Sequence, residues 1–136
     1  MIVVLDTNLV VSAAILMKSI ASRCFDHAMT AQDTISSPLA LDELLEVLKR
    51  TKFDKYVSVE DRLAVFADYS RLVRLVSSNT RISTCRDDDD NGLLEIAVDG
   101  QADVLVTGDL DLLVLNGQFL FVICTPRDYL ERFTTA

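Results

Sequence analysis

The chain has 136 residues, half of them apolar and a quarter charged, with a formal net charge of −8. This length fits one domain over residues 1–136, and the composition supplies a hydrophobic core and excludes a disordered chain. No apolar run reaches the ~18 residues of a membrane span. The N-terminus "MIVVLDTN" lacks the basic region and cleavage site of a signal peptide. We therefore expect a cytoplasmic protein with no membrane partner.

The first half of the chain predicts two strands and two helices. They are strands at 2–5 ("IVVL") and 34–37 ("TISS") and helices at 9–30 and 38–50. The first helix should break near Lys18-Ser19. The second has Ser37 as its N-cap and Pro38 in its first turn, an order typical of helix starts.

The second half predicts four helices and three strands. They are helices at about 59–71, from near Asn91, at 110–115 and at 125–133, and strands at 71–77, 103–107 and 119–124. Strands alternate with helices, which predicts an α/β fold with a parallel sheet covered on both faces. In such sheets, ligands bind beyond the carboxyl ends of the strands.

Cysteine and histidine are too sparse for a zinc site. Cys24, Cys85 and Cys124 are widely spaced, so we expect reduced thiols rather than a disulfide framework. The single histidine, His27, is interpreted as an ordinary helix residue. Any chemistry should therefore depend on carboxylates.

Basic residues concentrate in one segment of this acidic chain. Residues 49–86 hold nine of the thirteen Lys and Arg residues and only four acids. The segment is either a solvated helical face or a surface that contacts phosphates. Its candidates for nucleic-acid binding are Lys49, Arg50 and Lys52.

Two aspartates directly follow predicted strands. Asp6 comes after "VVL" and Asp109 after "VLVTG". If the strands are parallel neighbours, both side chains lie at the same edge of the sheet. Each could instead be a helix N-cap, a position that aspartate favours.

Four consecutive aspartates, Asp87 to Asp90, precede another predicted helix. Such a run is usually a solvated loop. Only Asp90 lies three, four and seven residues before the apolar positions 93, 94 and 97, so only Asp90 should face inward. Asp90 as the N-cap of this helix remains the alternative.

Glu43 is an acid on a largely apolar flank of its helix. Its neighbours four and three residues before and four residues after are Leu39, Ala40 and Val47. Burying a carboxylate is costly unless something pairs with it. Periodicity alone does not exclude Glu46.

Carboxylates without histidines suit a hard divalent cation. Mg²⁺ and Mn²⁺ take oxygen ligands. Clusters of carboxylates that hold such ions catalyse phosphodiester hydrolysis. Bound metal would also neutralise the acidic pocket, so that an acidic protein could accept RNA.

Several segments together resemble the PIN-domain nucleases. These are "VVLDTNLVVSA", "SPLALDELLEVL", "RDDDDNGLLEIAVDGQADVLVTGDLDLL" and "CTPRDYLERF". More narrowly, they resemble the toxins of bacterial toxin–antitoxin pairs related to VapC. The resemblance implies a single PIN-like domain over residues 1–136, with a three-layer α/β/α sandwich around a parallel sheet. It also implies Mg²⁺- or Mn²⁺-dependent cleavage of single-stranded RNA, a small antitoxin partner and a homodimer.

The resemblance assigns roles to residues of this chain. The catalytic acids of the family match Asp6, Glu43, Asp90 and Asp109, and this match selects Glu43 over Glu46. The expected metal ligands are Asp6, Asp90, Asp109 and Asp111.

Two polar residues match positions beside these acids, and one residue departs from the family pattern. Asn8 and Thr107 match the supporting positions. Relatives of this group usually have proline where this chain has Asp88, which loosens the loop and leaves Asp90 in place.

Other classes fit the sequence less well. A receiver-type phosphoacceptor needs paired acids after the first strand and a late lysine, but no lysine follows Lys55. A haloacid-dehalogenase-like phosphatase needs Asp-x-Asp where Asn8 stands. A catalytically idle PIN-type binding module remains open, and a metal-dependent cleavage assay separates it from a nuclease.

Overall fold

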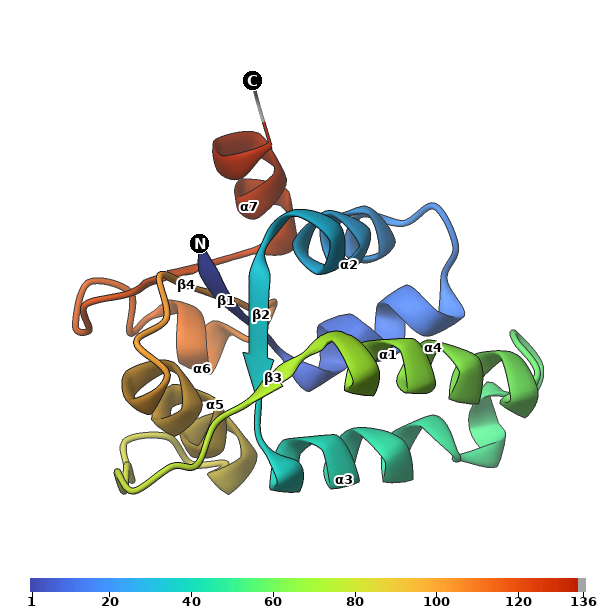
Figure 1. The fold of residues 1–136 in the computed structure, drawn as a ribbon, viewed down its shortest axis with the longest axis horizontal. Coiled ribbons are helices and arrows are strands. Elements are labelled where there is room, and N and C mark those ends of the chain that lie inside the picture. Colours follow the sequence, from blue (N-terminus) through green and yellow to red (C-terminus); the bar gives the residue numbers. More distant parts are fainter. Residues whose placement is uncertain (135–136) are drawn as a thin grey trace.

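All five strands of the central sheet run parallel, in the order β3-β2-β1-β4-β5. The computed structural model describes residues 1–134 (Figure 1). The strands are β1 (Ile2–Leu5), β2 (Asp33–Ser36), β3 (Arg74–Leu75), β4 (Val104–Val106) and β5 (Val122–Cys124). The chain builds β2 and β3 on one side of β1, and β4 and β5 on the other. The carboxyl ends of β1 and β4 are therefore the switch point where parallel sheets bind ligands.

Helices connect the strands and cover both faces of the sheet. Within residues 1–134 they are α1 (Thr7–Ile15), α2 (Ile20–Ala31), α3 (Pro38–Leu48), the 3-10 helix η1 (Thr51–Phe53), α4 (Val59–Leu72), α5 (Asp88–Asp99), α6 (Leu110–Leu113) and α7 (Pro126–Phe133). The three-layer α/β/α fold predicted from the sequence is confirmed.

Alternation along the strands divides the core into two parts. Val3 and Leu5 face a core shared with α1, α2, α3, α4 and α7. Val4, between them, faces a second core made with α5 and α6. Strands whose two faces are both buried read as continuous apolar runs, which explains "IVVL".

The predicted caps of α3 and α7 and the predicted break after α1 are confirmed. The side chains of Ser37 and Thr125 accept hydrogen bonds from N–H groups in the first turns of α3 and α7. The chain breaks between α1 and α2, where Lys18 has a φ of 63°. No single helix of the described chain is long and apolar enough to cross a membrane. Only α1 and α2 taken together reach that length and composition, and they are bent by 110°.

Two predicted strands were too long. The run 71–77 is helical up to Leu72, and β3 contains only two residues, which pair with β2 alone. The run 119–124 forms a strand only from Val122, which pairs with Val104, the first residue of β4. Before Val122 the chain has no strand partner, and Phe119 stacks on Phe121 with their centroids 5.0 Å apart.

Candidate metal and nucleic-acid site

Asp6 and Asp109 stand at the carboxyl ends of neighbouring strands, β1 and β4. Each is also the N-cap of the next helix. The Asp6 carboxylate accepts the N–H of Asn8 at 3.1 Å, and the Asp109 carboxylate accepts the N–H of Asp111 at 2.9 Å. The capping alternative considered from the sequence is therefore correct for both residues. Capping fixes both carboxylates at the same edge of the sheet.

The hydroxyl of Thr107 links these two acids. Thr107 is fully buried. It donates to the second oxygen of Asp6 at 2.6 Å and accepts the backbone N–H of Asp109 at 3.0 Å. Both oxygens of Asp6 are thus held by donors of the protein. Thr107 thus joins the residues that follow β1 and β4.

The aspartate run starts a helix earlier than expected. Asp87 is the N-cap of α5 and accepts the N–H of Asp89 at 2.9 Å, so Asp90 is not the N-cap. Three aspartates occupy the first turn, where the helix dipole stabilises negative charge. The predicted inward orientation of Asp90 is confirmed, because its exposed fraction is 7% while Asp87, Asp88 and Asp89 are exposed.

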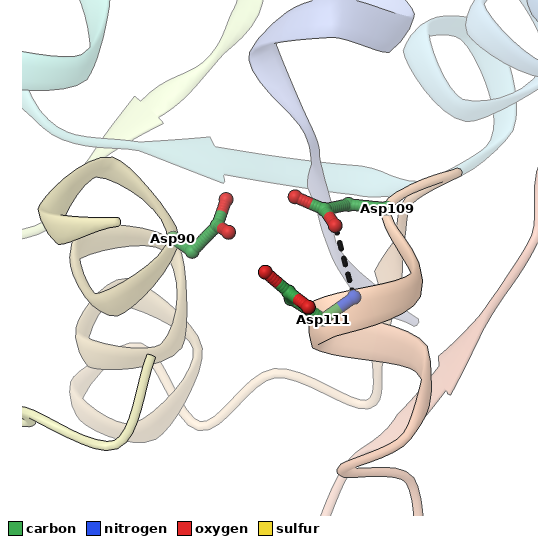
Figure 2. Close-up of side chains that lie close together, drawn as sticks. All are labelled: Asp90, Asp109 and Asp111. Atoms are coloured by element: carbon green, nitrogen blue, oxygen red, sulfur yellow. Dashed lines mark hydrogen bonds between the residues drawn. The ribbon is translucent and has the colours of Figure 1, made fainter. Parts of the chain in front are cut away.

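Three carboxylates converge at this edge of the sheet. One oxygen each from Asp90, Asp109 and Asp111 lies within 4.8 Å of the other two. Figure 2 shows the side chains turned toward one another, Asp90 from α5 and the other two from the start of α6. We call Asp90, Asp109 and Asp111 the acid cluster.

Asp6 and Glu43 line the cavity beside the acid cluster but are not members of it. The cavity has a volume of about 220 Å³ and is also lined by Asp90 and Asp109. Glu43 reaches it from α3. Glu46, the alternative left open by periodicity, is exposed and pairs with Arg50 at 3.8 Å.

Burial and crowding favour the protonated form of several of these acids. Burial, followed by the neighbouring Asp109 carboxyl, raises the pKa of Asp90 to about 7. Burial and the charge of Asp89 raise the pKa of Glu43 to about 7. Burial also raises the pKa of Asp6, against the hydrogen bonds from Thr107 and Asn8, which lower it. Such shifts are expected where like charges share a partly dry pocket.

The donors of the acid cluster fit a hard divalent cation. They are all carboxylate oxygens from three separate side chains, which is the chemistry that Mg²⁺ and Mn²⁺ prefer. No cysteine of the described chain belongs to the cluster. Asp6, expected as a further ligand, lies outside the cluster but lines the same cavity. Each of its oxygens accepts one hydrogen bond and keeps a lone pair for a cation, so its role as a ligand stays a prediction.

Only one of the three predicted basic contacts lines the cavity. Arg50 borders it, whereas Lys52 lies 5.1 Å from the centroid of the Phe53 ring and Lys49 is exposed. Arg62, also in the basic segment, is fully buried and donates to the carbonyl of Leu48 at 2.7 Å. The segment is therefore only partly available to phosphates.

Asn91 is a buried residue of the site that was missed from the sequence. Its side chain accepts the N–H of Cys85 at 2.8 Å and donates to the carbonyl of the same residue at 3.1 Å. It thereby closes the loop that leads into α5. An asparagine directly after an aspartate run looks like one more solvated residue, so the sequence carried no signal for this contact.

Asn91→Ala should lower the free energy of unfolding by about 1–2 kcal/mol, because the Cys85 N–H loses its acceptor. Asn79→Ala is the matched control. Asn79 is exposed in the same loop and contacts Asp99 through its backbone N–H at 2.7 Å. Urea unfolding checks both variants. Equal stability of the two variants would contradict a clamping role of Asn91.

Three layers with an acidic cavity at the switch point define an α/β domain that gathers carboxylates at the ends of β1 and β4. The chain belongs to the PIN domain family, whose model matches residues 2–111. The resemblance noted from the sequence is thereby confirmed.

Two known proteins are similar over nearly the whole chain. The uncharacterized protein MJ1680 of Methanocaldococcus jannaschii is 29% identical over 141 residues, which cover 96% of this chain and 90% of that protein. A chain in the crystal structure of VapBC2 from Rickettsia felis, bound to a DNA fragment from their promoter, superposes with a TM-score of 0.62. It is 15% identical, with 92% of this chain and 98% of that chain covered, so the two share a fold.

Proposed function

We propose that this chain is a metal-dependent endoribonuclease that cleaves single-stranded RNA, and that it is the toxin of a toxin–antitoxin pair. The observation that carries the nuclease assignment is the acid cluster, in which three carboxylate oxygens lie within 4.8 Å of one another. Its place beyond β1 and β4 is where parallel sheets bind ligands. Membership of the PIN domain family supports the same conclusion.

Asp90, Asp109 and Asp111 would hold Mg²⁺ or Mn²⁺. When bound, such an ion lowers the pKa of a water and stabilises charge on the phosphate. Asp6 lines the same cavity. Hydrogen bonds from the Thr107 hydroxyl and the Asn8 N–H stabilise its ionised form.

Glu43 is suited to hold a proton at its carboxyl group. Its pKa of about 7 lies near physiological pH, which is the range that favours general acid–base catalysis. Glu43 lines the cavity and is not a member of the acid cluster, so its carboxyl group would not be occupied by the cation.

The RNA backbone would cross the cavity beside Arg50. Arg50, which follows α3, lines the cavity, and Lys49 and Lys52 are exposed next to it in the sequence. These cations would take phosphates that flank the cleaved bond, which explains how a chain of net charge −8 could accept RNA.

The toxin assignment rests on the sequence resemblance and on the shared fold. The R. felis neighbour is VapBC2 bound to promoter DNA. By analogy, we propose a small antitoxin as the partner of this chain, a cytoplasmic location and a single domain over residues 1–136. We also propose a homodimer, which light scattering across a range of concentrations tests. A short adjacent reading frame for a small DNA-binding protein would support the antitoxin.

The purified chain should cleave single-stranded RNA in Mn²⁺ or Mg²⁺, and EDTA should stop the reaction. Cleavage products on a denaturing gel measure this directly. RNA that binds and stays intact at saturating Mn²⁺ would instead favour an idle binding module. Acetyl phosphate transfer to Asp6 tests the receiver alternative in the same preparation, and we expect none.

A further inference from the structure

Arg86 lies directly on one member of the acid cluster. Its Nη2 donates to both carboxylate oxygens of Asp111, at 3.0 and 2.9 Å. Asp111 is one of the three carboxylates whose oxygens converge within 4.8 Å. The Arg86 guanidinium is therefore paired with a carboxylate that a divalent cation would also bind.

The backbone on both sides of Arg86 is held by hydrogen bonds, while its side chain is exposed. Asn91 holds Cys85 by two hydrogen bonds, and Asp87 caps α5. The side chain of Arg86 is 87% exposed, against 42% for Asp111. Arg86 is thus anchored beside the acid cluster and can still change its partner.

The Arg86–Asp111 pair should exchange easily. Exposed ion pairs contribute little to stability because water screens them. A divalent cation shared by three carboxylates offers Asp111 a closer and stronger partner. When Asp111 turns to the cation, the guanidinium is left beside the acid cluster without its carboxylate partner.

A released Arg86 would complete a pair of arginines around the cavity. Arg50, which follows α3, lines the cavity. Arg86 contacts α6, where its partner Asp111 lies. The planar fork of a guanidinium matches two phosphate oxygens as well as it matches a carboxylate.

We propose that Arg86 is a phosphate-binding residue that exchanges Asp111 for the RNA backbone when a divalent cation enters the acid cluster. This proposal rests on the proposed nuclease function. Before the cation binds, Arg86 neutralises Asp111. Afterwards, Arg86 holds a phosphate of the bound strand, so metal binding and RNA binding support one another.

The test compares Arg86→Gln with Arg74→Gln in the full chain. Arg74 is a matched control, because its guanidinium also pairs with an exposed carboxylate, that of Asp33 at 2.9 Å. In calorimetry with Mn²⁺ alone, Arg86→Gln should bind the ion about two- to fivefold more tightly than wild type, since the competing charge is gone. Arg74→Gln should be unchanged.

A second measurement uses a fluorescent single-stranded RNA and stopped-flow anisotropy, read before products form. With Mn²⁺, Arg86→Gln should bind the RNA about tenfold more weakly than wild type, the scale of one charge-assisted contact. Without Mn²⁺ the difference between the two should be smaller, because Asp111 then competes with the RNA for Arg86. Arg86→Lys keeps the charge and loses the planar guanidinium, so its RNA affinity in Mn²⁺ should lie between those of wild type and Arg86→Gln. It also provides the test if Arg86→Gln misfolds.

Unchanged affinities for Mn²⁺ and RNA in both Arg86 variants would overturn the role of Arg86. The proposed nuclease would stand in that case, because wild type would still bind Mn²⁺ and cleave RNA. Wild type that neither binds Mn²⁺ nor cleaves RNA would overturn both proposals. A loss of RNA affinity that is equal with and without Mn²⁺ would overturn the exchange.

Discussion

Asp90→Asn should abolish RNA cleavage in Mn²⁺, lowering the rate on the order of a hundredfold or more, the scale of removing one electrostatic partner of a transition state. Asp88→Asn should stay within about twofold of wild type, as expected for a surface change. Asp90 is 7% exposed and faces Asp109 and Asp111. Asp88 occupies the same helical turn and is exposed.

This pair of variants is well matched. Each replaces one carboxyl group in the first turn of α5 by an amide of the same shape, so the two variants make the same chemical change at a buried and at an exposed position. Initial rates on one RNA substrate, with circular dichroism to confirm folding, compare them. Equal losses in both variants would mean that the aspartate run acts as a block of charge, and the special position of Asp90 would be refuted.

Mn²⁺ should raise the melting temperature of the wild-type chain. An ion that binds only the folded state stabilises it by RT ln(1 + [L]/Kd), about 2.7 kcal/mol at a hundredfold excess over Kd. For a domain of this length, each kcal/mol shifts the melting temperature by roughly 3–4 °C. A monovalent salt at equal ionic strength should have no comparable effect. Equal melting temperatures in saturating Mn²⁺ and in matched salt would exclude a metal site.

Asp109→Asn separates charge from capping in the same experiment. Asparagine can still accept the N–H of Asp111 and cap α6. The variant removes one of the crowded charges, so its metal-free form should melt slightly higher than wild type. Its response to Mn²⁺ should be weaker because a ligand is lost. A full response to Mn²⁺ would show that Asp109 is not a ligand.

The raised pKa of Asp90 also predicts how metal-free stability depends on pH. The folded chain keeps this proton up to a pKa of about 7, against a usual value of 3.8. The stabilising contribution is therefore complete below about pH 4 and is lost as the pH rises toward 7. The melting temperature of wild type relative to Asp90→Asn should fall across this window. A constant difference between the two would contradict the shift.

The sequence predicted most of the fold because residue preferences within single strands and helices agreed with the parallel α/β arrangement of the whole domain. β1 is a β-branched run bounded by Asp6, and α3 begins with a serine cap and a proline, so its start was unambiguous. β3 and β5 were overestimated because apolar runs do not reveal where a partner strand ends. β5 starts at Val122, the residue that pairs with Val104 at the start of β4.

The candidate site was predictable where position along an element decides orientation. The helical period predicted that Asp90 faces inward, and it is buried in the structure. The predicted ends of two parallel strands placed Asp6 and Asp109 at one edge of the sheet, and β1 and β4 are indeed neighbours. Contacts between segments were not predictable. Neither the clamp of Asn91 on Cys85 nor the pairing of Arg86 with Asp111, 25 residues away in sequence, leaves a local pattern.

A crystal of the chain soaked in Mn²⁺ and measured at the manganese absorption edge tests the metal site most directly. We predict an anomalous peak at the acid cluster, about 2.0–2.3 Å from carboxylate oxygens of Asp90, Asp109 and Asp111. In the same map, the guanidinium of Arg86 should have moved off Asp111. A map at saturating Mn²⁺ with no peak at these three carboxylates would contradict the assignment of this cluster as the metal centre of a nuclease.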